Sequence, residues 1–283
     1  MEISAQAVKE LREKTGAGLM ECKNALKETS GDLDKAIKFL KEKGTIKAAG
    51  KSGRATKEGI ICVAIAEDMS QGVLVEINSE TDFVARTDDF ISATQDITEH
   101  ILKSDAKSSS DLSQTIKDEV KALIARLGEN MGIGQMARIK NTSNGYLRSY
   151  IHQGGKIAVL LLSESTKKEI CSDPVFLNLT KDISMHIAAM NPSGLSKDDI
   201  DPKIIQEQKE IFMTQAKESG KPDNIIEKIV TGKLNQFLKE IVLLEQPFVK
   251  DPKQSIQKYV DAESKKLNDS IKIIQFIRFK VGE

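Results

Sequence analysis

The side chains that most often carry out chemistry are sparse in this sequence. The chain has three histidines, His100, His152 and His186. None of them occurs in an HExxH pattern or beside a cysteine, so their spacing indicates neither a metal site nor an activated nucleophile. His100 and His186 fall in helical patterns, where a histidine satisfied in the core or on the surface is expected. His152 lies at the tip of a predicted hairpin, where we expect it to be exposed.

The cysteines and the glycine-rich segments do not indicate catalysis either. Cys22, Cys62 and Cys171 are odd in number and far apart, so we expect free thiols and no zinc site. Residues 15–18 read Thr-Gly-Ala-Gly, but no strand precedes them and no Gly-Lys-Ser/Thr follows, which argues against a phosphate-binding loop. Nucleophile elbows and dinucleotide fingerprints are not found. We therefore expect a binding protein, not an enzyme, with no cofactor and no metal.

An aromatic ring beside a carboxylate marks the most unusual stretch, residues 73–86. Val73, Val75 and Ile77 alternate with other side chains as in a β-strand, and Leu74 makes one end apolar on both faces, which predicts a cover on each face. A helix begins near Thr87, a good N-cap. The connector between the two elements contains Thr81, Asp82, Phe83 and Val84.

Two interpretations of Phe83 remain open at this point. It could be a core residue that plugs the end of an α/β layer, because most phenylalanines are buried. Alternatively it could be an exposed wedge that fits a partner's pocket, with Asp82 directed at polar groups beside it, because aromatic anchors are typical interface hot spots.

Composition limits the possible classes of protein. The chain has 283 residues, of which 30% are charged, 39% are hydrophobic and 4% are aromatic. This predicts a helix-rich protein of more than one domain. The 42 Lys and Arg balance the 42 Asp and Glu, which argues against a general nucleic-acid binder. No apolar run approaches the ~18 residues of a membrane span and no signal core is visible, so we expect a soluble, cytoplasmic protein without a membrane partner.

The first 50 residues predict three short helices separated at 15–18 and 30–32. Leu19 and Met20 are adjacent, and a helix cannot bury two neighbours equally on a narrow face, so we expect one of them to face solvent or a partner. A unit this small favours docking over chemistry. Residues 44–58, rich in Gly, Lys, Ala and Ser, predict a mobile basic linker.

The middle of the chain repeats one arrangement of elements. Strands at 60–66 and 72–78 form a hairpin, helices follow near 87–102 and 114–127, and a strand is predicted at 135–140. A second hairpin at 146–151 and 156–163 precedes a helix at 174–190, and a last strand is predicted at 271–281. The sequence therefore predicts an α+β fold with two related halves.

Two helices interrupt the second half. Asp201 and Pro202 begin the first, and the turn at Ser219-Gly220-Lys221-Pro222 joins it to the second, which predicts a projecting antiparallel hairpin. We expect a three-helix N-terminal domain with linker at 1–53, a core subdomain at 54–140 and a second at 141–283, interrupted by the hairpin at 201–240.

Several blocks of the sequence, taken in order, read KELREKTGAGLMECKNAL, INSETDFVAR, SYIHQGGKIAVLL, MHIAA, SGKPDNIIEKIVTGKL and LLEQPFVKD, and FIRFKVGE follows near the C-terminus. Together these blocks resemble the elongation factor Ts family. The resemblance implies a nucleotide-exchange factor for elongation factor Tu, in its GDP-bound and nucleotide-free forms. It also implies a ubiquitin-associated-like N-terminal domain, a core of two α+β subdomains with antiparallel three-stranded sheets, and an inserted coiled-coil hairpin that self-associates into homodimers in some members.

The resemblance also implies roles for individual residues. Asp82 and Phe83, completed by Thr81 and Val84, match the segment that disturbs the Mg²⁺ and phosphate site of elongation factor Tu. N-terminal positions that contact the partner's nucleotide-binding domain correspond to Arg12, Leu19 and Met20. His152 matches a hairpin-tip residue that reaches a second domain of the partner, although Gln153 here separates it from the glycine that follows directly in many bacterial members.

Two other functions compete with this interpretation. One is a non-enzymatic adaptor that uses the ubiquitin-associated-like N-terminal domain for an unrelated partner. The other is a hydrolase that depends on His152 and His186. Neither explains the Asp82-Phe83 pair.

Overall fold

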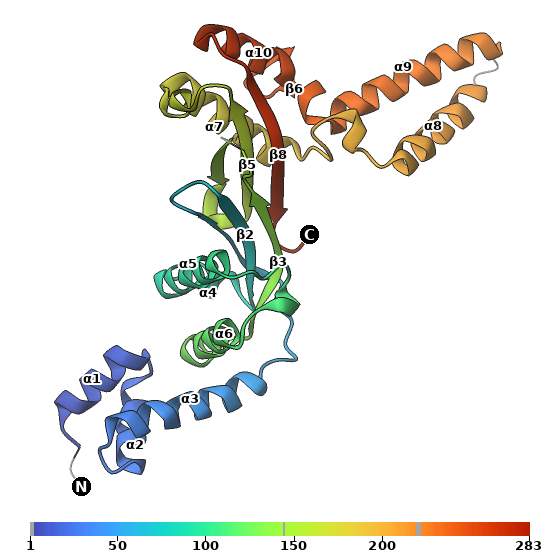
Figure 1. Cartoon of the computed structure of the whole chain (residues 1–283). Helices are drawn as coiled ribbons and strands as arrows, with labels where there is room; N and C mark the ends of the chain where they lie inside the picture. Colours follow the sequence, from blue (N-terminus) through green and yellow to red (C-terminus); the bar gives the residue numbers. More distant parts are fainter. Residues whose placement is uncertain (1–2, 144, 219–221) are drawn as a thin grey trace.

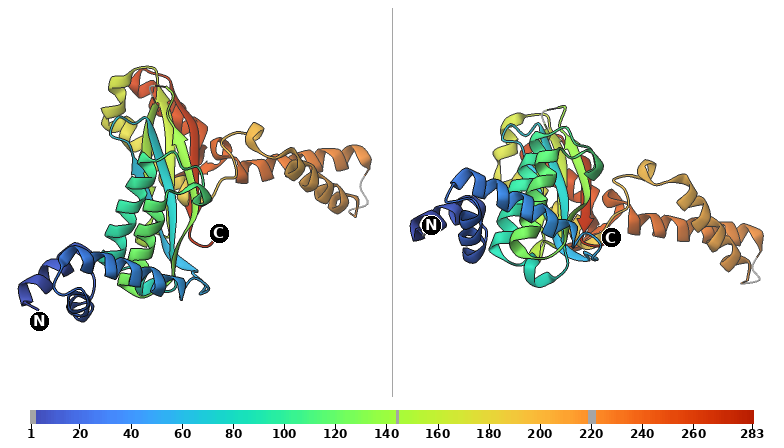
Figure 2. Two further views of the ribbon diagram at one scale, coloured as in Figure 1. Left: turned by 60° about the horizontal axis from the view of Figure 1, so that its bottom comes forward. Right: turned by 90° about the horizontal axis from the view of Figure 1, so that it is seen from below.

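The computed structural model describes residues 3–143, 145–218 and 222–283. The molecule is elongated, with a small helical unit at the N-terminal end, a layered core of sheets and helices, and a helical hairpin that projects from the far side (Figure 1, Figure 2). The predicted α+β class, the helical N-terminal region and the antiparallel three-stranded sheets are confirmed.

Three helices form the N-terminal unit, as predicted. They are α1 (Ala5–Thr15), α2 (Leu19–Glu28) and α3 (Leu33–Ala49). Ser4 caps α1 by accepting a hydrogen bond from the Ala7 amide at 3.1 Å, and Gly16 ends the helix in the left-handed region, at φ 64°. Leu11 and Leu26 are fully buried in the small core between the helices.

The prediction of a mobile linker from residue 44 was wrong for its first part. Helix α3 continues to Ala49 because its C-terminal half packs on helix α6 (Gln114–Leu127). Gly44 approaches Ala125 closely enough that a Cβ there would lie 3.1 Å from the Cβ of Ala125, and Ala48 is buried in the core of the first half. Tertiary packing therefore stabilises a helix in a segment whose composition indicates a linker.

The first sheet has the strand order β1-β2-β3. Its strands are β1 (Glu58–Ile65), β2 (Gln71–Ser79) and β3 (Met131–Lys140), all antiparallel to their neighbours. The third strand begins four residues before the predicted position 135. Val73, Val75 and Ile77 pack on the helices, whereas Leu74 packs on the second sheet, which confirms that this end of β2 is covered on both faces.

Helices cover one face of this sheet (Figure 1). They are α4 (Asp82–Ala85), α5 (Asp88–Lys103) and α6. Thr87 caps α5 as predicted, by accepting a hydrogen bond from the Phe90 amide at 3.2 Å, and Phe90 is fully buried. Gly128 ends α6 at φ 81°, as the sequence predicts. The short helix α4 was not predicted.

The second half repeats this layout with the strand order β4-β5-β8. Its strands are β4 (Gly145–Ile151), β5 (Ile157–Ser165) and β8 (Ile271–Lys280). Helix α7 (Pro174–Met190) has the predicted bounds, and α10 (Ile256–Leu267), which was not predicted, packs beside it. A small two-stranded sheet, β6 (Pro247–Phe248) with β7 (Asp251–Ser255), also lies here.

The two sheets pack face to face, with helices on both outer faces. Leu74, Leu147 and Leu160 are fully buried between the sheets. The same packing buries the carboxylate of Glu76, which accepts hydrogen bonds from Asn78 Nδ2 at 2.7 Å and from the Gly282 amide at 2.9 Å. The core therefore has four layers, in the order helices, sheet, sheet, helices, packed as one body. Side chains at its edges are attached to this packed scaffold.

The predicted hairpin consists of α8 (Pro202–Lys217) and α9 (Asp223–Ile241), which lie side by side and project from the core (Figure 2). Asp201 caps α8 as predicted, accepting from the Lys203 amide at 2.9 Å. Of the predicted turn, residues 219–221 lie outside the described residues. Short 3-10 helices occur at Ser109–Asp111, Gln153–Gly155, Lys168–Ser172, Lys197–Asp199 and Leu243–Glu245.

Candidate partner-binding site

Phe83 is the most exposed large apolar side chain among the described residues, with 82% of its surface accessible. It lies on α4, a helix of four residues. Ala85 on the same helix is 2% exposed and packs, with the half-buried Val84, on the core between sheet and helices. Because these residues anchor one side of α4, the ring of Phe83 is directed to solvent on the other. Phe83 is therefore exposed and is not a core residue, which rules out the first of the two interpretations left open by the sequence; its role as a wedge stays a prediction.

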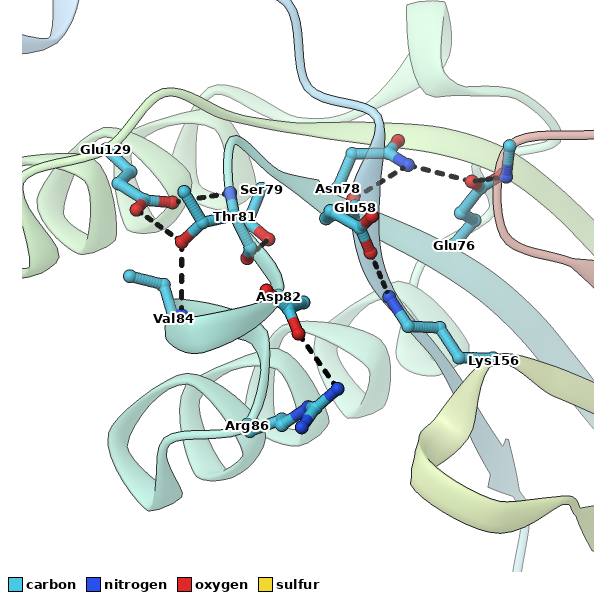
Figure 3. Close-up of polar contacts among 11 residues, drawn as sticks. Glu58, Glu76, Asn78, Ser79, Thr81, Asp82, Val84, Arg86, Glu129 and Lys156 are labelled. Carbon is cyan, nitrogen blue, oxygen red and sulfur yellow. Dashed lines mark hydrogen bonds and ion pairs between the residues drawn. The ribbon is translucent and has the colours of Figure 1, made fainter.

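Thr81 and Glu129 hold the start of α4 in place (Figure 3). The Thr81 amide donates to Glu129 Oε2 at 3.0 Å, and the Thr81 hydroxyl donates to Glu129 Oε1 at 2.6 Å. The same hydroxyl accepts a hydrogen bond from the Val84 amide at 3.3 Å, which is the N-cap of the helix. In addition, the buried Ser79 hydroxyl donates to the Thr81 carbonyl at 2.9 Å. Phe83 therefore lies on a helix whose N-terminal end is fixed by several hydrogen bonds.

Asp82 lies next to Phe83 and pairs with Arg86, Oδ2 to Nη2 at 2.8 Å (Figure 3). The pair spans one helical turn, and the two side chains are 37% and 74% exposed. An exposed pair of this kind contributes only about 0.3–0.5 kcal/mol. The carboxylate of Asp82 can therefore exchange Arg86 for a polar group of a partner at little cost.

Glu129 and Asn130 are the residues that sequence reasoning missed. The Asn130 amide donates to Glu80 Oε1 at 2.6 Å, and Glu129 in turn accepts from Thr81. Residues 80–81 and 129–130 are therefore joined by two carboxylates, one from each segment. Arg54 Nη1 pairs with the same oxygen of Glu80 at 3.4 Å. The only available signal was two polar residues, Glu129 and Asn130, between the C-cap of a predicted helix and a predicted strand. That signal does not identify a partner 48 positions away in the chain.

The structure brings the turn that carries His152 to the same end of the core as α4. Strand β1 connects them, because Glu58 at its start is paired with Ser79 in β2 and forms an ion pair with Lys156, just after the turn (Figure 3). His152 itself is exposed, and its Nδ1 lies 3.2 Å from the Tyr150 hydroxyl. Thr81, Asp82, Phe83, Val84 and His152 therefore lie along one edge formed by both halves.

The N-terminal residues Arg12, Leu19 and Met20 are all exposed, Leu19 by 57% and Met20 by 62%. The sequence predicted that one of the two apolar neighbours would face outward; in the structure both do. Arg126 connects this unit to the start of α5, the helix that follows α4, because its side chain lies against Gly16 while Nη2 donates to the Asp89 carbonyl at 3.1 Å. The three groups of predicted contact residues are thus tied to one another through the core.

Known proteins of one family resemble this chain over its full length. A model of the family described as Elongation factor TS matches residues 80–283. Among relatives named Elongation factor Ts, that of Nitratiruptor sp. is 45% identical, covering 100% of this chain and 94% of its own. Those of Trichlorobacter lovleyi and Nitratidesulfovibrio vulgaris are 41% and 40% identical over 100% of this chain, and 94% and 97% of theirs. The chain belongs to the elongation factor Ts family.

Two histidines of this elongation factor Ts family member lie away from the edge. His186 is fully buried, donates through Nε2 to Gln246 Oε1 at 3.0 Å, and accepts from the Val249 amide at Nδ1, 3.2 Å away. Burial lowers the pKa of His186 below its ordinary value, so the ring is neutral at pH 7. His100 pairs with Glu119 on the surface at 2.9 Å. Both are satisfied structural histidines, as the sequence predicts.

The described residues contain no group of three or more His, Cys, Asp or Glu arranged to hold a metal ion. Cys22 and Cys62 are buried free thiols and Cys171 is half-buried. Burial raises the pKa of the Cys62 and Cys171 thiols, which makes them poor nucleophiles. Over the described parts of the chain, no helix is both long and apolar enough to span a membrane.

Proposed function

We propose that this chain is a guanine-nucleotide exchange factor of translation elongation that binds elongation factor Tu in its GDP-bound form and promotes release of GDP. Membership of the elongation factor Ts family supports the class of function. The single observation that carries the mechanism is the 82% exposed ring of Phe83 on a helix that the core holds rigidly. No atom of this chain needs to take part in bond chemistry.

Phe83 acts as a wedge in this proposal. A GTPase holds its nucleotide through Mg²⁺ and through backbone amides that cradle the phosphates. Mg²⁺ demands near-ideal octahedral geometry, so a small displacement of the elements that carry its ligands weakens its binding strongly. Phe83 enters between those elements, and Asp82 leaves Arg86 for polar groups beside them. The partner then loses Mg²⁺ and afterwards GDP.

Further contacts hold the partner while its nucleotide site is open. Arg12, Leu19 and Met20 bind the nucleotide-binding domain, and His152 reaches a second domain. Their exposure and the connections through Arg126 and Lys156 support this assignment. Because all of these contacts come from one connected body, binding one domain of the partner raises the effective concentration of the other contacts.

Away from the edge that carries residues 81–84 and His152, we propose that α8 and α9 supply a surface for self-association. We also propose that the protein acts in the cytoplasm. We place the domain boundaries at 53/54 and 140/141, with 201–240 inserted into the second core subdomain. Among the described residues of the hairpin, three large apolar side chains have more than a third of their surface exposed, Ile204 and Ile211 on α8 and Ile225 on α9, which supports an interaction role for the hairpin.

Linkage provides the test of the exchange function. A factor that releases nucleotide must bind nucleotide-free partner better than loaded partner, and nucleotide must weaken its binding by the same factor. We expect a stable complex with nucleotide-free elongation factor Tu in mass measurements by light scattering, and its dissociation when GDP and Mg²⁺ are added together. A complex equally stable with and without GDP and Mg²⁺ would contradict an exchange function.

A further inference from the structure

Three consecutive residues just after the end of α6 hold two other segments of the chain. The Gly128 carbonyl accepts a hydrogen bond from Lys51 Nζ, Glu129 binds Thr81, and the Asn130 amide binds Glu80. Asn130 is buried, and its Nδ2 also donates to the Arg54 carbonyl at 2.7 Å. Residues 128–130, here called the 128–130 loop, therefore join the segment that leaves the N-terminal helices to the segment that enters α4.

Glu129 is the residue of this loop that controls the N-cap of α4. Both of its carboxylate oxygens are used by Thr81, at 3.0 Å from the amide and 2.6 Å from the hydroxyl. A threonine hydroxyl has one proton, so donation to Glu129 turns a lone pair toward the Val84 amide and fixes the capping rotamer. A helix of four residues is not stable by itself. The orientation of Phe83 in the free protein therefore depends on this carboxylate.

We propose that Glu129 is a positioning residue for nucleotide exchange, which holds residues 81–84 in the conformation that enters the partner. This inference rests on the proposed exchange function. A residue that preorganises a wedge without touching the partner changes the fraction of molecules ready to bind, and apparent affinity scales with that fraction. At saturation the partner itself imposes the bound conformation. Glu129 therefore affects only the concentration at which exchange is half-maximal, whereas removal of the Phe83 ring affects both that concentration and the maximal rate.

The test measures release of a fluorescent GDP from elongation factor Tu by stopped flow, over a range of factor concentrations, with Glu129→Gln. Glutamine keeps the volume but has only one acceptor oxygen for the two donors of Thr81. We expect the half-saturating concentration to rise about tenfold, the effect of one lost hydrogen bond to a charged acceptor. The maximal rate stays within about twofold of the parent.

Glu245→Gln is the matched control. Glu245 is also half-buried and pairs with Lys197 at 3.0 Å, but it lies in the second half, beyond the end of α9. Its substitution removes a comparable carboxylate contact remote from α4. We expect its exchange curve to superimpose on that of the parent.

Combination with Phe83→Ala separates positioning from a general structural effect. If Glu129 acts through Phe83, Glu129→Gln has no further effect on the half-saturating concentration once the ring is gone. An unchanged half-saturating concentration in Glu129→Gln alone, or an equal rise in both backgrounds, would overturn the proposal. A lowered maximal rate with unchanged half-saturation would overturn it as well.

Thr81→Val gives a second route, because valine keeps the volume and removes the hydroxyl that reaches Glu129. We expect the same rise in half-saturating concentration, and no additional rise when both substitutions are combined. Amide hydrogen exchange with solvent, measured by NMR on the free protein, reports the loss of the hydrogen bond between the Thr81 amide and Glu129 directly. We expect the Thr81 amide hydrogen to exchange faster in Glu129→Gln than in the parent. If Phe83→Ala leaves GDP release unchanged, the exchange mechanism fails; if it slows release while Glu129→Gln does nothing, only the positioning role fails.

Discussion

Replacement of Phe83 by alanine tests the wedge most directly. A phenylalanine buries about 150–250 Å² when it is fully covered. With 82% of the ring exposed in the free protein, about 160 Å² remains to be buried in a complex. At about 25 cal/mol per Å² this amounts to about 4 kcal/mol, or roughly a thousandfold in rate if all of it is realised while the metal site is distorted. Measured costs of truncating interface anchors, about 2–4 kcal/mol, predict a reduction of roughly 30- to 1000-fold.

The fold itself should barely respond to this substitution. The ring makes little contact with its own core, so we expect the free energy of unfolding to change by less than about 0.5 kcal/mol. Urea denaturation followed by circular dichroism checks this point. Ile274→Ala, at a residue that is 38% exposed on β8, provides the control for loss of an exposed apolar side chain.

Stopped-flow release of a fluorescent GDP from elongation factor Tu, at saturating concentrations of each variant, measures the effect. We expect Phe83→Ala to lose most of the stimulated release and Ile274→Ala to keep it. A Phe83→Ala protein that is folded and stimulates release at the parent rate would refute the wedge.

Three further predictions concern contacts and stability. Serine at both Leu19 and Met20, which are exposed, should leave the fold intact and weaken binding to nucleotide-free elongation factor Tu about tenfold or more in a fluorescence titration; unchanged affinity would remove these residues from the contact surface. Gly155→Ala should lower the free energy of unfolding by about 1–2 kcal/mol in urea, because Gly155 has φ 73° and a Cβ there would lie 3.1 Å from the Cβ of Ile60; a loss below about 0.5 kcal/mol would contradict this. Burial lowers the pKa of His186, so below its ordinary value of 6.5 the unfolded chain takes up the proton first and stability falls as pH decreases, by at most about 1.4 kcal/mol per pH unit. His186→Asn should flatten this dependence between pH 7.5 and 5.5, and an identical slope in both proteins would show that other groups cause it.

The predictions that succeeded depend on local patterns. Helix α7 has the predicted bounds because Asp173 caps it and proline stands in its first turn, at Pro174. Gly128 ends α6 because only a residue that tolerates positive φ fits there. The alternation of side chains in β2 and its doubly apolar end at Leu74 indicated two covers, and the structure has both. In each case the signal lies within a few residues of the feature.

The predictions that failed required contacts between distant segments. Residues 44–49 have the composition of a linker, yet they are helical because Gly44 and Ala48 pack on the first half of the core. Helix α10 and the hydrogen bonds between Thr81 and Glu129 were likewise not predicted. Local propensity is a weak term, and burial against another element outweighs it.

The sequence alone therefore determined the class of fold, the repeat of two halves and the residues worth attention, because periodicity, caps and ordered family blocks are local properties. Only the tertiary structure decided where those residues face. The sequence of the four-residue helix α4 does not specify which of its sides faces the core. In the structure Ala85 and Val84 pack on the core of the first half, and this leaves Phe83 facing outward. The carboxylate that keeps it there belongs to a loop 48 positions further along the chain. Such a contact arises from the packing of α6 on the sheet and leaves no periodic signal in the sequence.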